Sequence, residues 1–360
     1  MPSGKHEKIA IVIYSLKRDG AEKVVAVLSQ QFARLGHQVT VIAFDGRDIG
    51  YEIGGELIDL ALPSHPKPGF LRKALTLVMR AWRLRHVYRQ SQFDRIIAVM
   101  ESAAFPSILT GYNTIVSNHC NPDIYFTRYE WLLARILYPR AKNVVMVSKQ
   151  GEQSLQQRLN LHNLHCIYNP VDFSELGRLA TKEPAISMDG EYIIAVARLE
   201  KQKRLDRLIT AFAESDLKQT LKLLVLGEGS LRQALQQQIK ALQLTDRVIL
   251  AGNVANPFPN IRAARFLVLS SDHEGFPMVL IEALALGKPV ISTDCETGPA
   301  EIINSGQNGF LVPLHDTAGL AKAMDVLNQN ESLYQQFCTQ ASASVSHLSV
   351  GKISRQWLAL

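Results

Sequence analysis

Two carboxylates, Glu274 and Glu282, stand close together in the most apolar part of the sequence. Glu282 lies in a segment, 278–286, whose other residues are all apolar, and Pro277 before it and Gly287 after it are start and stop signals of a helix. A helix that is apolar on nearly every side is buried, and a lone carboxylate inside it is costly unless it is paired or hydrogen-bonded. Glu282 therefore needs a partner.

Two interpretations of these carboxylates are open. In one, Glu282 bonds an Arg or a backbone group of the protein, and Glu274 only lies in the positive field in front of the helix N-terminus. In the other, that N-terminus and its Gly275-Phe276-Pro277 turn face an anionic ligand, and both carboxylates bond ligand hydroxyls.

Cationic side chains are concentrated in the segment 197–204, directly after an expected strand. Arg198 could bind a diphosphate through its planar guanidinium, and Lys203 could bind it as a point charge. The simpler interpretation is a solvated loop without a ligand. The pattern Gly227-x-Gly229 follows the next strand and opens a helix. Such glycines allow close approach of the backbone, but this pattern alone is a weak signal.

The first half of the chain offers two further segments. Residues 17–22, with Gly20 before a helix, could present backbone amides to a phosphate, but they lack the GxGxxG pattern of a dinucleotide fold, which argues against an NAD enzyme. His119 follows a strand and could hydrogen-bond a substrate, with a structural histidine as the alternative. The pair His162 and His165 has no further ligand at metal spacing, and no Asp-x-Asp pair flanks a strand, so we expect no catalytic metal.

These segments all follow short apolar stretches that predict strands. The expected strands are 9–14, 39–44, 95–99, 114–117, 143–147 and 165–168, and then 192–196, 222–226, 248–251, 266–269 and 289–292. Strands separated by helices predict two parallel, doubly wound α/β sheets of Rossmann type. The break at 169–172 and a polar, irregular stretch at 174–189 place the domain boundary, giving 1–170 and 171–349. Ligands bind at the carboxyl ends of such strands, so we expect the site there.

The overall composition is that of a globular protein of the cytosol. Of the 360 residues 47% are apolar, and the mean hydropathy is near zero. The four cysteines are scattered without a CxxC pair, so neither a disulfide framework nor a thiolate metal site is indicated. We find no apolar run of membrane-spanning length and no signal-peptide pattern.

Positive charge is concentrated in residues 1–170, which hold 21 Lys and Arg against 13 Asp and Glu. An amphipathic helix expected over 69–90 lies in an acid-free segment and carries five cations that we single out: Arg72, Lys73, Arg80, Arg83 and Arg85. Such a helix can lie on an anionic membrane surface. Alternatively, its apolar side packs on the sheet and its charges are solvated. Nucleic acid is a weaker candidate, because the binding signatures are missing.

Taken together, these motifs resemble those of the retaining glycosyltransferases of family four, which have the GT-B fold. The resemblance covers essentially the whole chain and rests on Glu274-x7-Glu282, Gly275-Phe276-Pro277, the strand 289–293, Gly298-Pro299-x-Glu301-Ile302, Arg198, Lys203, Gly20-Ala21-Glu22, His119, Asn308-Gly309 and Val312-Pro313. It implies two Rossmann-like domains facing across a cleft, the first binding the acceptor and the second the donor. It also implies a C-terminal helix, at about 350–360, that packs back on the first domain.

The resemblance further implies roles for single residues. Glu282 would bond the ribose hydroxyls and Glu274 those of the donor sugar, while Arg198 and Lys203 would stabilise the departing diphosphate in place of a metal. His119 would orient the sugar or the acceptor. The remaining donor-binding residues would be Gly20, Gly227, Gly275, Phe276, Pro277 and Val279. Asp19 stands where the family often has a second Gly, which changes how this loop can meet the diphosphate.

For the acceptor, the residues around 270–301 and the basic helix are similar to transferases that build polysaccharide, O-antigen or N-glycan precursors on polyprenyl diphosphate. We therefore expect transfer of a hexose or N-acetylhexosamine, such as Gal, GlcNAc or GalNAc, from a UDP-sugar to a lipid-linked saccharide. The enzyme would be cytoplasmic, peripheral at the inner face of the membrane, and free of cofactors. The alternatives are a transferase for a soluble acceptor, a non-catalytic sugar-nucleotide binder and a nucleotide-dependent oxidoreductase.

Overall fold

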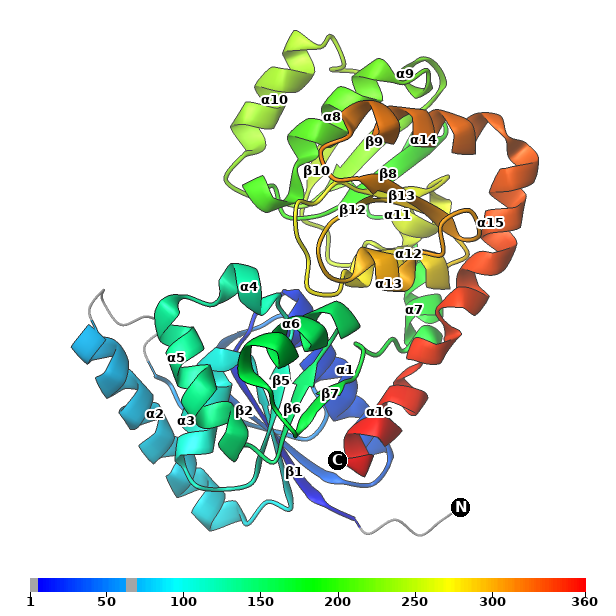
Figure 1. The fold of residues 1–360 in the computed structure, drawn as a ribbon. Helices are drawn as coiled ribbons and strands as arrows, with labels where there is room; N and C mark the ends of the chain where they lie inside the picture. Colours follow the sequence, from blue (N-terminus) through cyan, green and yellow to red (C-terminus); the bar gives the residue numbers. More distant parts are fainter. Residues whose placement is uncertain (1–5, 63–69) are drawn as a thin grey trace. The chain divides into compact units, whose positions relative to one another are not determined.

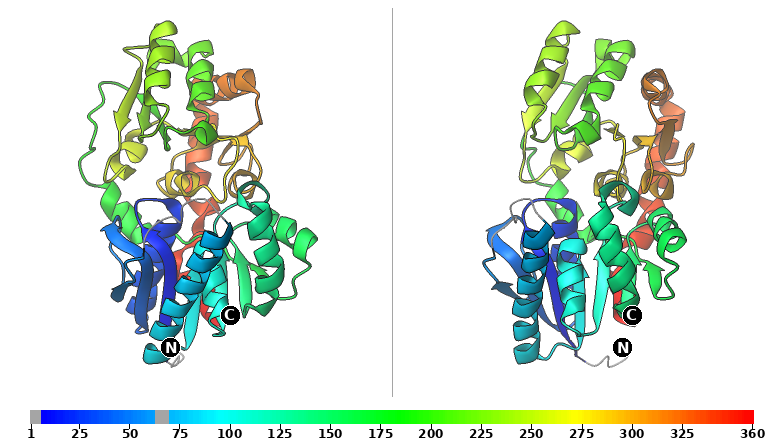
Figure 2. Two further views of the ribbon diagram at one scale, coloured as in Figure 1. Left: turned by 90° about the vertical axis from the view of Figure 1, so that its left-hand side faces the viewer. Right: turned by 60° about the vertical axis from the view of Figure 1, so that its left-hand side comes forward.

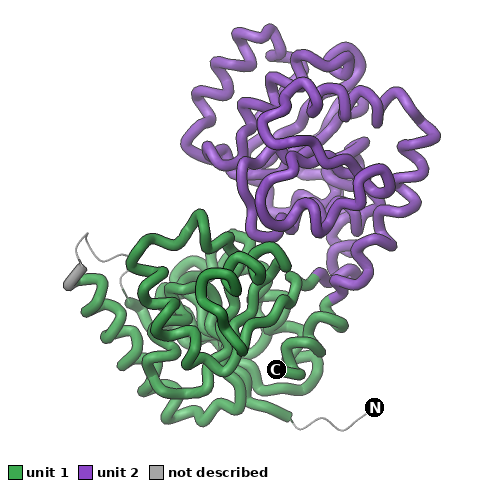
Figure 3. The backbone as a smooth tube through the Cα atoms, viewed as in Figure 1, with its two compact units in different colours: residues 1–170, 350–360 green, residues 171–349 purple. Residues whose placement is uncertain are grey.

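A computed structural model describes residues 6–62 and 70–360, and the chain divides into two compact units (Figure 3). The first unit consists of Met1–Pro170 together with Val350–Leu360, and the second of Val171–Ser349.

The first unit is built on a seven-stranded parallel sheet (Figure 1). The strand order is β3-β2-β1-β4-β5-β6-β7, with β1 (Lys8–Leu16), β2 (Gln38–Ile49), β3 (Glu56–Asp59), β4 (Arg95–Val99), β5 (Thr114–Asn118), β6 (Asn143–Met146) and β7 (Leu164–Cys166). The strand β3 was not predicted, because its two apolar residues, Leu57 and Ile58, are too few to form a pattern. The other six were.

Helices cover both faces of this sheet (Figures 1 and 2). One face carries α1 (Gly20–Arg34) and α16 (Val350–Ala359); the other carries α2 (Phe70–Ser91), α3 (Glu101–Leu109), α5 (Arg128–Leu137) and α6 (Lys149–Leu159), with the short α4 (Pro122–Tyr125) before α5. The guanidinium of Arg95 donates hydrogen bonds to the carbonyl oxygens of Trp357 and Leu358, at 2.9 Å and 3.0 Å. The predicted return of the C-terminal helix to the first unit is thereby confirmed.

The second unit contains a six-stranded parallel sheet of order β10-β9-β8-β11-β12-β13. Its strands are β8 (Tyr192–Val196), β9 (Lys222–Leu226), β10 (Val248–Gly252), β11 (Leu267–Leu269), β12 (Val290–Asp294) and β13 (Gly309–Pro313). No strand was predicted at β13, where the family resemblance places a late loop at Asn308-Gly309 and Val312-Pro313. In the sheet, a Cβ at Gly309 would lie 2.1 Å from the carbonyl oxygen of Val290, so this glycine permits close strand pairing.

The helices of the second unit are α7 (Phe173–Ala180), α8 (Leu205–Glu214), α9 (Leu217–Thr220), α10 (Arg232–Ala241), α11 (Phe258–Ala263), α12 (Met278–Ala285), α13 (Pro299–Ile302), α14 (Thr317–Gln329) and α15 (Glu331–Ser344). The helix α7 corrects the expectation of an irregular stretch over 174–189. Asp172 caps this helix by accepting a hydrogen bond from the amide of Glu175 at 3.1 Å, and Leu176 is buried. The capping signal outweighs the polar composition.

Candidate active site

The carboxyl edge of the second sheet holds a buried ion pair between Lys203 and Glu274. Lys203 ends the 3-10 turn η2 (Lys201–Lys203) after β8, and Glu274 follows β11. The distance from Lys203 Nζ to Glu274 Oε1 is 2.6 Å, and the two side chains are only 16% and 8% exposed. The hydroxyl of Ser271 donates a second hydrogen bond to the same carboxylate oxygen, also at 2.6 Å. The lysine ammonium is therefore fixed at the carboxyl edge of the sheet by a charge-assisted hydrogen bond.

Hydrogen bonds to the main chain connect the two loops that carry this ion pair. The amide of Asp272 donates to the carbonyl oxygen of Gln202 at 2.9 Å, and the Gln202 side chain donates to the carbonyl oxygen of His273 at 2.7 Å. The hydroxyl of Ser270 donates to the carbonyl oxygen of Lys203 at 2.8 Å. The main chain on both sides of the ion pair is thus held by hydrogen bonds between loops far apart in sequence.

Two arginines bind the carboxylate of Asp272, which lies in one of these loops. Arg204 and Arg207 donate to the carboxylate of Asp272, at 3.1 Å and 2.9 Å respectively. Arg204 also pairs with Asp206 at 2.9 Å, and buried Arg207 donates to Nδ1 of His315 at 2.8 Å. Sequence reasoning did not find this network, because the partners of Asp272 come from another strand connection.

The turn before α12 is seated against the loop that follows β12. Gly298 has a φ of +98°, and a Cβ there would lie 2.5 Å from Cδ of Pro277 and 3.1 Å from Cα of Phe276. The hydroxyl of Thr297 donates to the backbone carbonyl of Glu274. Only glycine fits at residue 298, because any side chain there would collide with the Gly275-Phe276-Pro277 turn. The glycine therefore allows the loop after β12 to pack against this turn.

The helix α12 is buried, as its composition predicts. Leu280, Ile281, Ala283 and Leu284 are buried, and Glu282 among them is 6% exposed. The burial of Glu282 is compatible with both interpretations of its role. Val279 and Gly275 are half-buried at the start of this segment.

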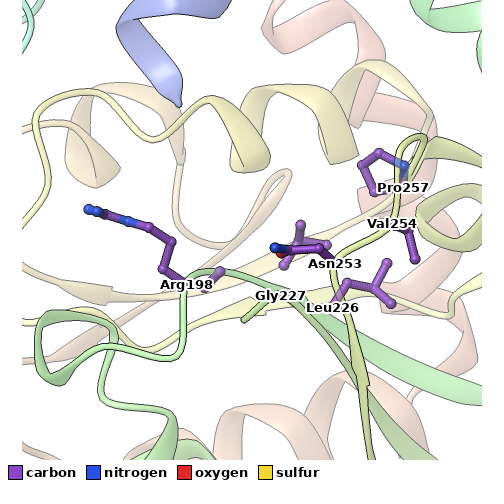
Figure 4. A pocket seen from close by; sticks show the side chains of 8 residues that line it. Arg198, Leu226, Gly227, Asn253, Val254 and Pro257 are labelled. Atoms are coloured by element: carbon purple, nitrogen blue, oxygen red, sulfur yellow. The ribbon is translucent and has the colours of Figure 1, made fainter. Parts of the chain in front are cut away.

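A small pocket opens where β8, β9 and β10 end, with a volume of about 170 Å³ (Figure 4). It is lined by Val196, Ala197, Arg198, Leu226, Gly227, Asn253, Val254 and Pro257. The predicted donor residues Arg198 and Gly227 therefore come together in one pocket. The sequence-based search missed Asn253 and its neighbours, although they directly follow β10 and the same edge-of-sheet argument applies to them.

The glycines of the Gly227-x-Gly229 pattern are required by packing inside the unit. A Cβ at Gly227, where φ is +144°, would lie 1.9 Å from the carbonyl oxygen of Ala197, and a Cβ at Gly229 would lie 2.5 Å from that of Leu199. The amide of Gly227 already donates to the carbonyl oxygen of Gly252 at 2.8 Å. These glycines thus allow the segment after β9 to approach the segment after β8 closely.

In the first unit, His119 lies just beyond β5. Its Nε2 is 2.9 Å from the hydroxyl of Ser117, while its buried Nδ1 has no hydrogen-bond partner within the described residues. Burial lowers the pKa of His119 to about 4, and Asn169 partly opposes that shift. The imidazole is therefore neutral at physiological pH.

Gly20 begins α1, and Asp19 is the N-cap of this helix. The carboxylate of Asp19 accepts a hydrogen bond from the amide of Gly20 at 3.0 Å. A Cβ at Gly20 would meet nothing within 4 Å, so packing does not require glycine there. The Asp19 carboxylate thus already accepts the hydrogen bond that the Gly20 amide could otherwise donate to a phosphate.

Of the five cations singled out on α2, Arg72, Lys73, Arg83 and Arg85 are exposed. Arg85 also donates to the carbonyl oxygen of Thr110 at the end of α3.

The assignment of Arg80 to the solvent face of α2 is wrong. Its side chain turns into the unit, where it is 8% exposed and lies 5.0 Å from the ring centre of Tyr14 and 4.8 Å from that of Phe44. Burial lowers the pKa of Arg80. Cation–π contacts with two rings compensate for part of the lost hydration and tie the helix to β1 and β2.

Within residues 6–62 and 70–360, no group of three or more His, Cys, Asp or Glu side chains is arranged to hold a metal ion. In the same part of the chain, no helix has both the length and the apolar composition needed to cross a bilayer.

Two family models match the chain. Residues 18–175 match the model described as Glycosyltransferase Family 4, and residues 179–343 match the one described as Glycosyl transferases group 1. Together they cover both units.

Two similar proteins come from Campylobacter jejuni. The first is N-acetylgalactosamine-N,N'-diacetylbacillosaminyl-diphospho-undecaprenol 4-alpha-N-acetylgalactosaminyltransferase, which is 29% identical over 365 residues. The second is GalNAc-alpha-(1->4)-GalNAc-alpha-(1->3)-diNAcBac-PP-undecaprenol alpha-1,4-N-acetyl-D-galactosaminyltransferase, 25% identical over the same length. Each match covers 98% of both chains. Among solved structures, that of HepE from Anabaena in complex with UDP is similar with a TM-score of 0.80 and 20% identity, covering 98% of both chains.

Proposed function

We propose that this chain, which belongs to the family-four glycosyltransferases of the GT-B fold, moves a hexose or N-acetylhexosamine from a UDP-sugar to a saccharide linked to polyprenyl diphosphate. The observation that carries the proposal is the buried pair of Lys203 and Glu274 beside the pocket of Arg198. The names of the Campylobacter relatives and the UDP complex of HepE support an undecaprenyl-linked acceptor and a uridine nucleotide.

In this proposal, the diphosphate of the donor lies between Arg198 and Lys203. A lysine ammonium has three N–H donors, so Lys203 can keep its bond to Glu274 and still donate to a phosphate oxygen. The pocket volume of about 170 Å³ suits only a part of the donor. We assign the base to it, because Asn253 offers an amide and Val254 and Pro257 offer apolar walls.

The carboxylates act on hydroxyl groups of the donor. Glu274 bonds the sugar, and Glu282, deeper in α12, bonds the ribose. The backbone amides of Gly275 and Phe276 lie toward the sugar, where Pro277 and Val279 complete the binding segment. Gly20, in the first unit, remains a predicted donor-binding residue, and a Cβ at this residue would meet nothing within 4 Å.

We propose transfer with retention of configuration. The acceptor hydroxyl attacks the anomeric carbon from the face that the diphosphate leaves; the new glycosidic bond forms as the bond to the phosphate oxygen breaks. The acceptor proton passes to that oxygen, while Arg198 and Lys203 stabilise the negative charge that develops on the diphosphate. Neutral His119 orients the sugar or the acceptor through a hydrogen bond.

A screen for UDP release tests this function. The chain is offered UDP-Gal, UDP-GlcNAc and UDP-GalNAc, each with a short polyprenyl-diphosphate saccharide, with a free oligosaccharide, or alone. We expect rapid release with one sugar and only with the lipid-linked acceptor. Equal release with the free oligosaccharide would favour the soluble-acceptor alternative, and donor binding without release would make the chain a binder.

A metal-free mechanism predicts that transfer survives chelation. Because two cations of the protein are proposed to stabilise the leaving diphosphate, excess EDTA should leave the initial rate unchanged in the same UDP-release assay. A loss of rate that manganese restores would contradict this part of the proposal.

A further inference from the structure

The helix α2 leaves a row of large apolar side chains uncovered by its own unit. Leu75, Val78, Met79 and Trp82 are between 36% and 70% exposed. Their spacing of three and four residues puts them on one side of the helix, a stripe that we call the outer face of α2. Large apolar residues clustered in this way on a soluble surface mark an interaction site.

The outer face is not the face with which α2 packs on the sheet. That role belongs to a second set of residues, Ala81, Leu84 and Tyr88, which are buried in the core of the first unit. Figure 2 shows the helix lying along the outside of the unit. The core therefore does not explain the outer face, which would be polar in an ordinary surface helix.

Cations border the outer face. Arg72, Lys73, Arg83 and Arg89 are exposed on α2, and this helix contains no acidic residue. The side chain of Trp82, which is 66% exposed, is stacked on His86 with ring centres 6.5 Å apart. An apolar stripe with a tryptophan and a border of one charge sign complements an anionic lipid surface, which has both an oily layer and phosphates.

The neighbouring helix α5 also exposes apolar side chains and arginines, although it carries one acid, Glu130. Leu132 and Ile136 are 55% and 46% exposed, and the exposed Arg128 and Arg135 lie on the same helix. The ammonium of Lys73 lies 5.7 Å from the ring centre of Tyr129, which brings the two helices together near their first turns. Since both helices come after parallel strands, they begin at the carboxyl edge of the sheet, where His119 also lies.

We propose that the outer face of α2, with the exposed residues of α5, docks on an anionic lipid bilayer. The helix lies in the plane of the membrane, with Leu75, Val78, Met79 and Trp82 among the upper acyl chains and the flanking cations at lipid phosphates. The inference deepens the proposed function, on which it rests for its biological sense, because a lipid-linked acceptor would then meet the carboxyl edge of the first sheet. Docking itself requires neither donor nor acceptor.

Vesicle flotation tests the docking surface. The full chain is mixed with vesicles of phosphatidylcholine and phosphatidylglycerol, without donor or acceptor. We expect the double variant Val78→Ser, Trp82→Ser to lose binding on the order of tenfold or more, because two apolar side chains no longer enter the lipid. The matched control Leu242→Ser, Val326→Ser changes the residue that follows α10 and a residue of α14, each 38% exposed, and it should float like the wild type.

Tryptophan fluorescence gives a second readout. Trp357 is buried and Trp131 is packed against the core, so a blue shift on adding vesicles should come from Trp82 and vanish in Trp82→Phe. Flotation of the double variant equal to the wild type, or an unmoved emission, would overturn the proposal. So would a wild-type dimer that the double variant converts to a monomer while neither form binds vesicles, because the occupant would then be a second copy of the chain.

The failure of docking and the failure of the proposed function can be told apart. Turnover with a water-soluble, short-chain acceptor should be the same in the wild type and in the Val78→Ser, Trp82→Ser variant. Vesicle binding that depends on α2, combined with no transfer to any acceptor, would reject the function and keep the surface. Transfer that proceeds normally in a chain that ignores vesicles would do the reverse.

Discussion

The two units place their charges in opposite ways. In the second unit, the cation Lys203 is held inside, at the edge of the sheet, by Glu274 and by loops that are hydrogen-bonded to each other. In the first unit, the edge holds His119, which is neutral because burial lowers its pKa to about 4. The cations of α2 in this unit are instead exposed on the outside of the helix, except for Arg80.

This difference distinguishes a binding site from a docking surface. A fixed, desolvated cation favours charge that develops at one point, as on a leaving diphosphate, because little reorganisation is needed when the charge appears. Mobile, hydrated cations around an apolar stripe suit an extended anionic surface without fixed geometry.

The largest effect is expected from the interior cation. Lys203→Ala should lower the kcat for UDP release by about two to three orders of magnitude, as the loss of one oriented donor to a developing oxyanion does. The matched control is Lys201→Ala, which removes an exposed lysine of the same turn and should change kcat little. A folded Lys203→Ala enzyme with wild-type kcat would remove this residue from the mechanism.

Next in size is the contrast between apolar residues of the two helices. Leu280→Ala, in buried α12, should lower the free energy of unfolding by about 2–5 kcal/mol because it leaves a cavity. Leu75→Ala, on the outer face of α2, should change it by less than about 0.5 kcal/mol. Urea unfolding followed by circular dichroism measures both. Comparable losses would mean that the outer face is covered within the chain.

The buried exception on α2 should behave like a core residue. Arg80→Ala removes a side chain that lies over Tyr14 and Phe44, and we expect a loss of about 1–3 kcal/mol from cation–π contacts and packing. Arg83→Ala, which removes an exposed arginine three residues further along, should be neutral in the same unfolding assay. If flotation, and not stability, responded to Arg80→Ala, the inward assignment would be contradicted.

The smallest effect is expected on the pH dependence of stability and comes from His119, at the carboxyl edge of the first sheet. An unfolded histidine takes up a proton as the pH falls below about 6.5, whereas native His119 does so only near pH 4. Stability should therefore fall as the pH is lowered through this window, by at most about 2 kcal/mol at pH 5. In His119→Gln that component should be missing from urea unfolding compared at pH 7 and pH 5. An identical pH dependence in both proteins would indicate a solvated, ordinary histidine.

Much of the fold follows from local patterns. Short strands such as β4, β8 and β9 were predicted to the residue, because each contains a continuous apolar run of strand length. The misses have a local cause as well. The strand β13 is bounded by Gly309 and Pro313 like a loop, and α7 is polar enough to hide the capping role of Asp172.

The candidate site was predicted as a set of residue types. Glu274, Lys203 and Arg198 were chosen because each follows a strand, and parallel strands end at one edge. The partners that hold them, among them Gln202 and Ser270, carry no sequence signal of their own. Asn253 was missed for the same reason, since an isolated amide in a loop is common.

Local sequence was enough to predict two parallel sheets, a buried α12 and a basic α2, because hydrophobic period and charge are properties of neighbouring residues. The pairing of Lys203 with Glu274, the inward turn of Arg80 and the exposure of Trp82 became known from the folded chain. Those outcomes depend on which strand connections meet in space, and a helix with two apolar sides does not reveal which side its own unit will cover.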